Sequence, residues 1–509
     1  MIEPLLEVIP TITIPICCLI LFLVCSLLWR ASPVSQEPPV LRSKLPFLGH
    51  FLSLLKFKYQ YHVNNHKKYN LSAYTLPILG GKLYVASSPQ LAASVFEKRT
   101  LSFEPLIDSF VRTLVGLDGQ GMQLWTDPEF RTAIFRVLYR GLGGQSLADL
   151  TTGAVSKAAD FFNELSPGQL EVVDFYAWIR KVVATNVMSC FYGDLSPFSN
   201  PRVLQSFWTY NDEMHKLLPG IAPSLVAANA YEARTEVIKA LETYIRKEND
   251  FGDDVPQFTR DRFNAERKFG MSIHDSAKIE VLLATALANV PTLTYWLITH
   301  IYNQPELLAR IREELLGAAV QDDSTSAEEL QITLRLGEIK DRCPLLFSCL
   351  QETQRHNIVD SITRTVMKDT AISDGGRSYL LKKGNSVQMP LSVLHANPNV
   401  WGDDSDVWIG DRSLKLGYMT STPPGFHPFG GGKHICPGRH LANSLTIGFA
   451  AQLLLNFDVS GVDDSILRVP KAEVPWPTTG IGRPESKQDL GARISRRKGW
   501  EHVKWSVVC

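Results

Sequence analysis

The sequence predicts a mainly α-helical protein with small β-sheets, preceded by one transmembrane helix. Three observations predict this class. Residues 9–29 form a single uncharged apolar run, and from about residue 50 to residue 357 apolar residues recur mostly at helical spacing. Short β-like pieces then follow, separated by glycine-rich or charged turns. A chain of 509 residues is also long enough to bury a large core.

The apolar run Ile9–Trp29 is the expected membrane anchor, and residues 1–8 are the expected lumenal N-terminus. The run is about as long as the roughly 20 apolar residues that a spanning helix needs. A cleaved signal peptide is the alternative, but Glu3 and Glu7 precede the run and no A-x-A site follows it. The basic residues just after the run place residues 50–509 in the cytosol. We expect a single-pass protein of the endoplasmic reticulum membrane.

Residues 30–49 are expected to form a proline-rich, semi-rigid linker, because prolines favour extended backbone and interrupt helices. One large domain, residues 50–509, would follow. Its most regular expected helices are Ser276–Tyr302, Gln304–Leu316, Cys343–His356 and Leu441–Leu455, and its expected strands are Ile362–Val366, Tyr379–Leu381 and Ser386–Met389.

Charge and cysteine content exclude several classes of function. Lys+Arg and Asp+Glu both number 52, so no net field attracts nucleic acid, and we expect no nucleic-acid partner. The eight cysteines include no C-x-x-C pair, so neither a zinc site nor a disulfide framework is predicted. This pattern is typical of a reducing compartment, where one cysteine can act through its thiolate.

The most informative segment is residues 427–439, HPFGGGKHICPGR, which precedes the last apolar helix. Its glycines allow close backbone approach, so a flat cofactor can lie against the loop while N–H groups and the helix dipole stabilise a thiolate at Cys436. Phe429 is placed to shield the sulfur, and His434 and Arg439 supply cationic side chains for anionic groups of the cofactor. The alternative is a glycine-rich turn with an inert, buried cysteine.

The spacing F-x-x-G-x-x-x-C-x-G, filled by Phe429, Gly432, Cys436 and Gly438, resembles the signature of the cytochrome P-450 superfamily. The resemblance implies the P-450 fold and a haem b cofactor whose iron is bound by the Cys436 thiolate. It also implies that the two cationic side chains of the loop pair with the haem propionates, and that the other signature residues line the cofactor.

A carboxylate and a guanidinium, Glu352 and Arg355, lie three residues apart on one helix face. Such a pair alone is most often a solvent-exposed ion pair that contributes little. Its position matches the family's E-x-x-R, which implies a structural pair near the haem, locked to an arginine in the later loop. Arg412 is the candidate for that arginine. Arg364 resembles the family's propionate-binding arginine, its alternative being an ordinary charge at a strand edge.

The expected distal helix lacks the family's acid–alcohol pair. Asn289 has no titratable group and Val290 no hydroxyl, while Pro291 should kink the helix. Asn289 is therefore a candidate for the catalytic site, its alternative being a bond to its own kinked backbone. An asparagine followed by proline resembles the branch of sterol 7-alpha-hydroxylases and prostacyclin synthase. The family's W-x-x-x-R is not clear here, since Trp125 and Arg131 are spaced differently.

The resemblance implies a monooxygenase that uses dioxygen and NADPH electrons from a separate reductase. Its expected substrate is lipophilic, such as a sterol, triterpenoid or other polycyclic secondary metabolite, as in a fungal biosynthetic enzyme. The alternative is a haem-thiolate isomerase or dehydratase acting on a peroxide without a reductase, which the missing acid and alcohol favour. Oxygenation is preferred because ordered water can substitute in a proton chain. A haem-binding sensor is disfavoured, since no output domain is visible after residue 460.

Overall fold

The computed structural model describes residues 36–43, 49–165, 168–247, 251–321, 331–473, 480–485 and 490–508. The chain divides into two compact units, of which the first contains the chain up to Ser102 together with Thr363–Pro390, and the second contains the rest. The expected anchor at residues 9–29 lies outside the described residues. Within them, one stretch, Ile273–Tyr302, is long and apolar enough to cross a membrane, but 72% of its apolar window is buried in the protein. It is therefore a core helix.

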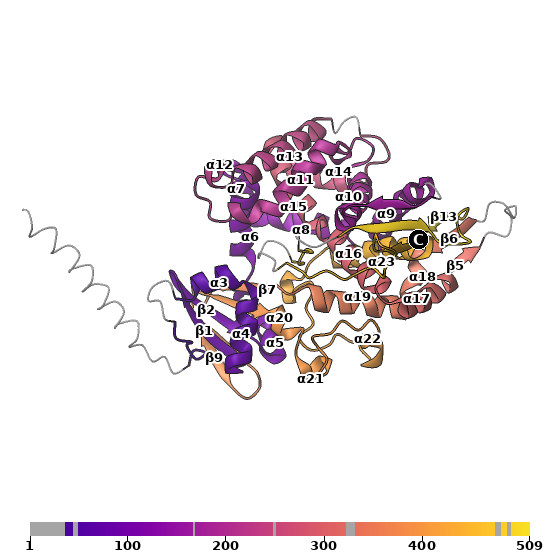
Figure 1. Ribbon diagram of the computed structural model, residues 1–509. Coiled ribbons are helices and arrows are strands. Elements are labelled where there is room, and N and C mark those ends of the chain that lie inside the picture. Colours follow the sequence, from indigo (N-terminus) through magenta and orange to yellow (C-terminus); the bar gives the residue numbers. More distant parts are fainter. Residues whose placement is uncertain are drawn as a thin grey trace, which may run out of the picture. The chain divides into compact units, whose positions relative to one another are not determined.

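The first unit is built around a five-stranded sheet in the order β1-β2-β10-β7-β3 (Figure 1). Its strands are β1 (Ala73–Ile78), β2 (Gly81–Ala86), β3 (Leu101–Ser102), β7 (Ser361–Val366) and β10 (Ser386–Pro390). Strand β10 runs parallel to β2, whereas β1 with β2 and β3 with β7 are antiparallel. A separate hairpin joins β8 (Thr370–Ser373) to β9 (Ser378–Leu381), and the helices are α3 (Phe51–Phe57), α4 (Tyr59–Tyr69) and α5 (Pro89–Glu97).

Part of the expected linker belongs to this first unit, so the domain begins before residue 50. Leu41 N–H donates to the Thr75 carbonyl at 2.9 Å, and Thr75 N–H donates to the Pro39 carbonyl at 2.8 Å. Leu41 is also buried with Leu76 in an apolar cluster under the sheet. The prolines keep this segment extended, as predicted, but extended backbone beside an open strand forms hydrogen bonds and does not remain a tether.

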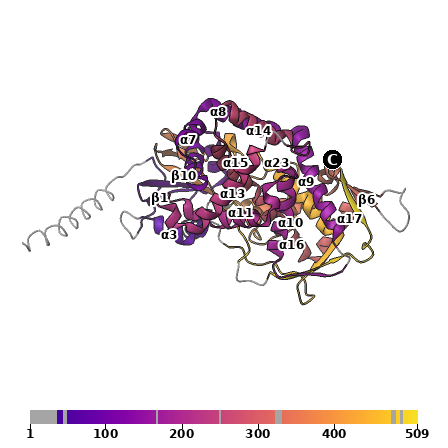
Figure 2. The ribbon, with the colours of Figure 1, turned by 90° about the horizontal axis from the view of Figure 1, so that it is seen from above.

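The second unit is mostly helical (Figures 1 and 2). Its helices are α6 (Glu104–Phe110), η1 (Val111–Val115), α7 (Gly119–Thr126), α8 (Pro128–Gly141), α9 (Gly144–Glu164), α10 (Phe175–Tyr192), η2 (Pro197–Ser199), α11 (Pro201–Glu213), η3 (Met214–Leu217), α12 (Pro223–Val226), α13 (Ala228–Arg246), α14 (Gln257–Lys268), α15 (Ile273–Leu287), α16 (Asn289–Tyr302), α17 (Pro305–Gly317), α18 (Leu336–Arg342), α19 (Pro344–Asn357), α20 (Leu391–Leu394), α21 (Pro398–Trp401), α22 (Arg412–Lys415), η5 (Gly432–His434) and α23 (Arg439–Asn456).

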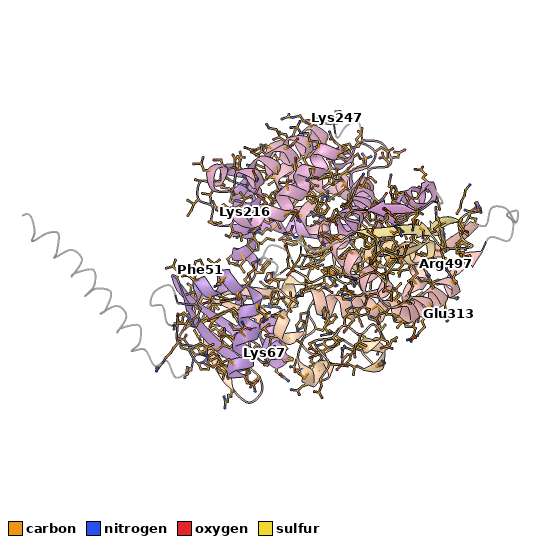
Figure 3. The ribbon with its side chains drawn as sticks, in the orientation of Figure 1. Phe51, Lys67, Lys216, Lys247, Glu313 and Arg497 are labelled. Carbon is orange, nitrogen blue, oxygen red and sulfur yellow. The ribbon has the colours of Figure 1, made fainter. Side chains whose placement is uncertain are left out.

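Two small sheets complete the second unit. They are ordered β11-β12-β4 and β13-β6-β5. Their strands are β4 (Leu170–Val172), β5 (Ala319–Gln321), β6 (Gln331–Arg335), β11 (Phe457–Ser460), β12 (Ala492–Arg496) and β13 (Lys504–Val508). Charged side chains such as Lys216, Lys247 and Glu313 lie exposed on the surface of the helices and their connections (Figure 3). The prediction of a mainly helical protein with small sheets is confirmed.

The central helix of the second unit is interrupted between α15 and α16. It begins where Ser272 accepts the Asp275 N–H, an N-terminal cap. The break falls at Ala288, whose N–H is shared between the carbonyls of Ala284 and Thr285 at 3.2 Å each. Pro291 has no N–H to donate to the carbonyl four residues earlier, so the helix loses a bond at this point. From Val290 to Tyr302, helix α16 is buried, and it packs against α10, α19 and α23.

Candidate active site

The loop before α23 holds Cys436 in a hydrogen-bonded turn. Cys436 N–H donates to the Phe429 carbonyl at 3.0 Å, and Gly430 N–H donates to the His427 carbonyl at 3.0 Å. Gly430 and Gly432 have φ values of +76° and +62°, a left-handed conformation that side chains disfavour. The glycines predicted from the sequence therefore shape this turn, and they present Cys436 just ahead of the N-terminus of α23.

The surroundings of Cys436 set it apart from the other described cysteines. Cys190, Cys343 and Cys349 are buried, whereas Cys436 is exposed. Desolvation raises the pKa of the Cys436 thiol, while a hydrogen bond from the Gly438 backbone and the charge of Arg439 act to lower that pKa. Thiolates form and bind metals where such donors and cations are available. The exposure of Cys436 does not match the alternative of a buried cysteine, and its role as an iron ligand stays a prediction.

The two cationic side chains predicted for the loop make different contacts. Arg439 Nη1 donates to the Cys436 carbonyl at 3.2 Å, which keeps its guanidinium beside the turn. His434 Nε2 accepts the Phe103 N–H at 3.2 Å, and its ring packs against the Phe103 ring at 6.2 Å. The structure thus places His434 against Phe103, and the pairing of His434 with an anionic group of the cofactor stays a prediction.

The carboxylate of Glu352 lies at the centre of a buried charge cluster. It accepts Arg355 Nε and Nη2 at 2.7 Å each, Arg412 Nε at 3.0 Å and the Ile409 N–H at 3.0 Å. All three charged residues are at most 4% exposed. The structure thus places Arg412 against the Glu352–Arg355 pair, and backbone carbonyls together with the Asp404 carboxylate accept the remaining guanidinium N–H groups. Charged groups can remain buried when their hydrogen-bond donors and acceptors all have partners, as they do here.

His395 connects this cluster to the cysteine loop. Its Nδ1 lies 3.1 Å from the Ile358 carbonyl, and its Nε2 accepts the His427 N–H at 3.2 Å. Arg355 Nη1 also donates to the His395 carbonyl at 2.8 Å. Burial, with the nearby cationic groups, lowers the pKa of His395 to about 3, so the ring is neutral. No motif spacing identifies His395, and only the structure assigns it this linking position.

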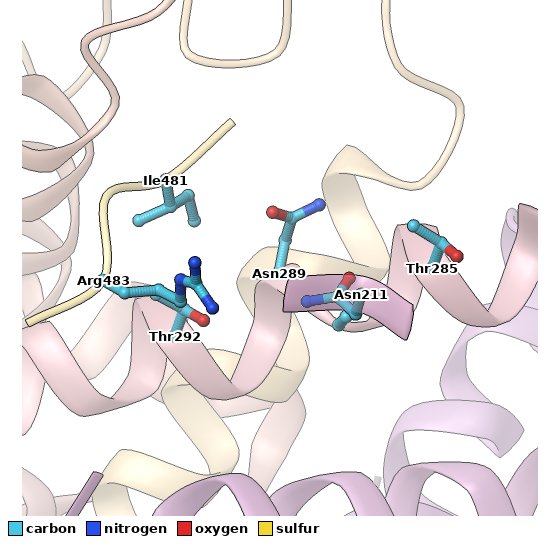
Figure 4. A pocket seen from close by; sticks show the side chains of 7 residues that line it. Asn211, Thr285, Asn289, Thr292, Ile481 and Arg483 are labelled. Atoms are coloured by element: carbon cyan, nitrogen blue, oxygen red, sulfur yellow. The ribbon is translucent and has the colours of Figure 1, made fainter. Parts of the chain in front are cut away.

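A polar pocket lies at the break between α15 and α16 (Figure 4). It encloses about 290 Å³, counting space open to solvent, and is lined by Asn211, Thr285, Ala288, Asn289, Thr292, Ile481 and Arg483. Asn289 Nδ2 donates to the Ala286 carbonyl at 3.3 Å, the backbone bond that the sequence left as an alternative. The side chain of Asn289 is nevertheless exposed to the pocket, so this contact does not remove it from the site.

An ion-pair bridge borders this pocket. Arg180 holds the Asp212 carboxylate with two hydrogen bonds, at 2.9 and 3.2 Å, and Arg483 approaches the same carboxylate at 2.6 Å. The Arg180 guanidinium also lies 3.8 Å from the centre of the Trp208 ring. Local sequence does not reveal this bridge, because its partners Arg180, Asp212 and Arg483 come from distant segments.

Trp125 and Arg131 are brought together despite their unusual spacing. Trp125 Nε1 donates to Asp108 Oδ1 at 3.0 Å, Arg131 pairs with the same carboxylate, and Arg131 Nε donates to the Trp125 carbonyl at 2.8 Å. The connection between α7 and α8 makes this possible, because it turns the chain between the two residues. A fixed-spacing motif search misses such a pair.

Arg364 belongs to the first unit, on β7. It is 4% exposed, its Nη1 donates to the Thr363 carbonyl at 2.9 Å, and its guanidinium lies 5.7 Å from the centre of the Phe96 ring. Burial lowers its pKa to about 10. A role on the cofactor stays a prediction for this residue.

The residues of the cysteine loop fit a thiolate-ligated haem. Cys436 offers one exposed sulfur beside a helix N-terminus, and Arg439 lies next to it as a cation. Among the described residues, no group of three or more His, Cys, Asp or Glu side chains could hold a bare metal ion. An iron ion held by a single protein side chain needs further ligands, and the nitrogen atoms of a haem macrocycle supply them. The fold and the site together define a haem-thiolate protein.

Comparison with known proteins gives the family. The Cytochrome P450 family profile matches residues 38–486, which is most of the chain. A cytochrome P450 monooxygenase of Gibberella zeae is 30% identical over 502 residues, covering 96% of this chain and 95% of that protein. The chain belongs to the cytochrome P450 family. It is an oxidoreductase of the haem-thiolate type, with a small-molecule substrate and a redox partner as the family implies.

Two further relatives refine the picture. Cytochrome P450 monooxygenase nodJ of Hypoxylon pulicicidum is 26% identical over 491 residues, covering 94% of this chain and 93% of that protein. The solved structure of cyanobacterial CYP120A1 with retinoic acid bound superposes with a TM-score of 0.67 at 18% identity, covering 91% of this chain and 99% of that chain. The expected P-450 fold is confirmed, and the relatives from Gibberella zeae and Hypoxylon pulicicidum are monooxygenases of fungi.

Proposed function

We propose that the protein is a membrane-anchored monooxygenase that oxidises a lipophilic substrate, such as a sterol, a triterpenoid or another polycyclic secondary metabolite. Dioxygen is the oxidant, and NADPH supplies electrons through a separate reductase. The anchor is residues 9–29, whose sequence is typical of a spanning helix in the endoplasmic reticulum with the catalytic domain in the cytosol.

The observation that carries the proposal is the geometry of the cysteine loop. The turn fixes Cys436 ahead of α23; desolvation raises the pKa of its thiol, and the Gly438 backbone and the charge of Arg439 oppose that rise. When bound, a thiolate-ligated haem supplies an iron whose electron density favours cleavage of the O–O bond. The cluster of Glu352, Arg355 and Arg412 supports the loop through His395, because His395 bonds to both. Haem retention therefore depends on residues that lie outside the loop.

Proton supply is the step for which this chain lacks the usual side chains. Asn289 and Val290 have no group that titrates. Nearby, the Thr292 hydroxyl lies 3.0 Å from the Tyr176 hydroxyl, and the polar pocket beside Asn289 is open to water. Ordered water held by such groups can carry protons in place of an acid. We assign Asn289 the role of orienting that water.

A second candidate is a haem-thiolate isomerase or dehydratase that rearranges a peroxide. The observation that favours it is the same absence of an acid and an alcohol at residues 289 and 290. Such an enzyme uses neither dioxygen nor a reductase. The monooxygenases among the relatives weigh in favour of oxygenation.

The test is product formation by membranes that contain the full-length protein. Sterols, triterpenoids and lipid peroxides are supplied with and without NADPH and a reductase, and membranes with Cys436→Ala serve as the control. Turnover of a sterol or triterpenoid only with NADPH supports the proposal. Conversion of a peroxide without NADPH, and no NADPH-dependent product, would replace it with the isomerase.

A further inference from the structure

The pocket at the α15–α16 break has a composition unlike the rest of the helical core. Five of its seven lining residues are polar, namely Asn211, Thr285, Asn289, Thr292 and Arg483. The space open to the centre of a water-sized sphere is only about 20 Å³, and a single water needs roughly 10–15 Å³ of such space. The pocket therefore has room for about one water-sized polar group, such as one oxygen of a larger molecule.

Hydrogen-bond donors in this pocket remain available to a ligand. An amide NH₂ group has two N–H donors. Within the described residues, Asn289 uses one on the Ala286 carbonyl at 3.3 Å, and Asn211 uses one on Asp212 at 3.5 Å. One N–H of each asparagine is left over. The Thr285 hydroxyl, in contrast, already donates to the Val281 carbonyl at 2.7 Å.

The guanidinium of Arg483 adds fixed positive charge at the pocket wall. It approaches Asp212 at 2.6 Å, but Arg180 already engages both oxygens of that carboxylate. Glu473, the other acid near Arg483, is 3.8 Å away and 39% exposed. Two guanidinium groups thus face two carboxylates, of which only Asp212 is close, and the N–H groups of Arg483 that do not point at Asp212 can donate to an acceptor oxygen.

The segment that carries Arg483 is anchored before any ligand arrives. Trp296 Nε1, on the buried helix α16, donates to the Gly482 carbonyl at 2.7 Å, and Asp212 holds the guanidinium itself. Figure 4 shows Asn211, Asn289 and Arg483 gathered around the pocket from three separate parts of the second unit. Preorganised donors bind a ligand without a further ordering cost.

We propose that Asn211, Asn289 and Arg483 form a specificity site that binds a hydrogen-bond-accepting oxygen on an otherwise apolar substrate. The oxygen belongs to a carbonyl or hydroxyl at one end of the molecule. The site selects oxygenated polycyclic compounds over the parent hydrocarbons. This inference rests on the proposed function, because it specifies the substrate class of the same enzyme.

The test measures binding and not turnover. Equilibrium dialysis of the full-length holoprotein in detergent is carried out with three tritium-labelled probes: the steroid ketone androstanone, the alcohol androstanol and the hydrocarbon androstane. We expect the wild type to bind the ketone or the alcohol at least about tenfold more tightly than androstane. Arg483→Gln and, on another element, Asn289→Leu should each reduce this preference by roughly threefold to tenfold, the effect of one lost hydrogen bond.

The matched control is Arg493→Gln, which removes an arginine from a surface ion pair with Glu171 and Asp464. Arg493→Gln should leave the preference for the oxygenated probes unchanged, and Arg483→Lys should keep part of that preference. Any of three results would overturn the proposal. The wild type binds all three probes equally, it does not bind the oxygenated probes, or both pocket variants keep the preference unchanged. NADPH-dependent turnover by the same preparations is measured separately, so failure of the specificity site is distinguishable from failure of the proposed function.

Discussion

Replacing Glu352 by Gln should destabilise the second unit strongly, because it removes the one carboxylate shared by two buried guanidinium groups. The side chain of Glu352 is fully buried and accepts four hydrogen bonds, three of them from arginines at 2.7 to 3.0 Å. Glutamine keeps the shape but not the charge. Breaking a buried pair in this way costs about 3–5 kcal/mol, since Arg355 is left without an acid partner and Arg412 keeps only the exposed Asp404.

The assay is urea unfolding followed by tryptophan fluorescence, to which Trp401 and Trp408 beside the cluster contribute. If the free energy of unfolding falls by about 3 kcal/mol per M of urea, the predicted loss of stability lowers the urea concentration at the midpoint of unfolding by about 1–2 M. Haem content per protein should fall as well, because His395 couples this cluster to the cysteine loop.

The matched control for this experiment is Glu338→Gln. Glu338 also pairs with two arginines, Arg335 at 2.9 Å and Arg342 at 2.8 Å, but all three side chains are 35% to 58% exposed. Its midpoint and haem content should stay at wild-type values, because exposed pairs contribute little. If the two variants unfold at the same urea concentration, the reasoning from burial is refuted.

Three further predictions follow from the site and the core. Cys436→Ala should abolish the thiolate-type carbon monoxide spectrum, and an unchanged spectrum would end its assignment as the iron ligand. The pKa of His395 is about 3 in the fold and about 6.5 when unfolded, so the unfolded chain binds more protons between these values. The free energy of unfolding should therefore fall as pH drops below 6.5, by about 2 kcal/mol from this group at pH 5, and His395→Gln should show a shallower acid slope in urea titrations. Burial and the neighbouring Glu280 raise the pKa of Glu266 to about 8, so the folded chain binds the extra proton and stability is lost as pH rises from 4.5 through 8. Glu266→Gln should be more stable than the wild type at pH 9 in thermal unfolding, and a variant that is less stable there contradicts the sign.

Local pattern was sufficient for most elements of the fold. Helix α19 runs over Pro344–Asn357 where the sequence predicts Cys343–His356, and strands β7, β9 and β10 match the predicted pieces to within one residue at each end. These elements are predictable because their apolar spacing repeats over neighbouring residues. The role of residues 38–41 was not predictable in the same way. Hydrogen bonding of an extended segment depends on which strand edge it meets, and β1 lies more than thirty residues away.

The residues of the candidate site likewise include some that local sequence predicts and some that it does not. Cys436, Phe429, Gly432 and Gly438 are recognisable because a tight turn before a helix needs particular residues at fixed offsets. The contact of His434 was not predictable, since the N–H that it accepts belongs to Phe103, more than three hundred residues earlier in the chain. Such a contact depends on the fold and not on the local sequence.

The sequence by itself determined the class of protein, the turn that presents the cysteine sulfur, the Glu352–Arg355 pair and the absence of an acid at residue 289. Only the tertiary structure decided that Arg412 completes the pair, that His395 joins it to the cysteine loop, and that Arg180, Asp212 and Arg483 border a polar pocket. The physical reason is the separation along the chain over which each kind of interaction acts. Turn and helix preferences act between residues a few positions apart, whereas buried charges are stabilised by groups from any part of the chain that folding brings within about 3 Å.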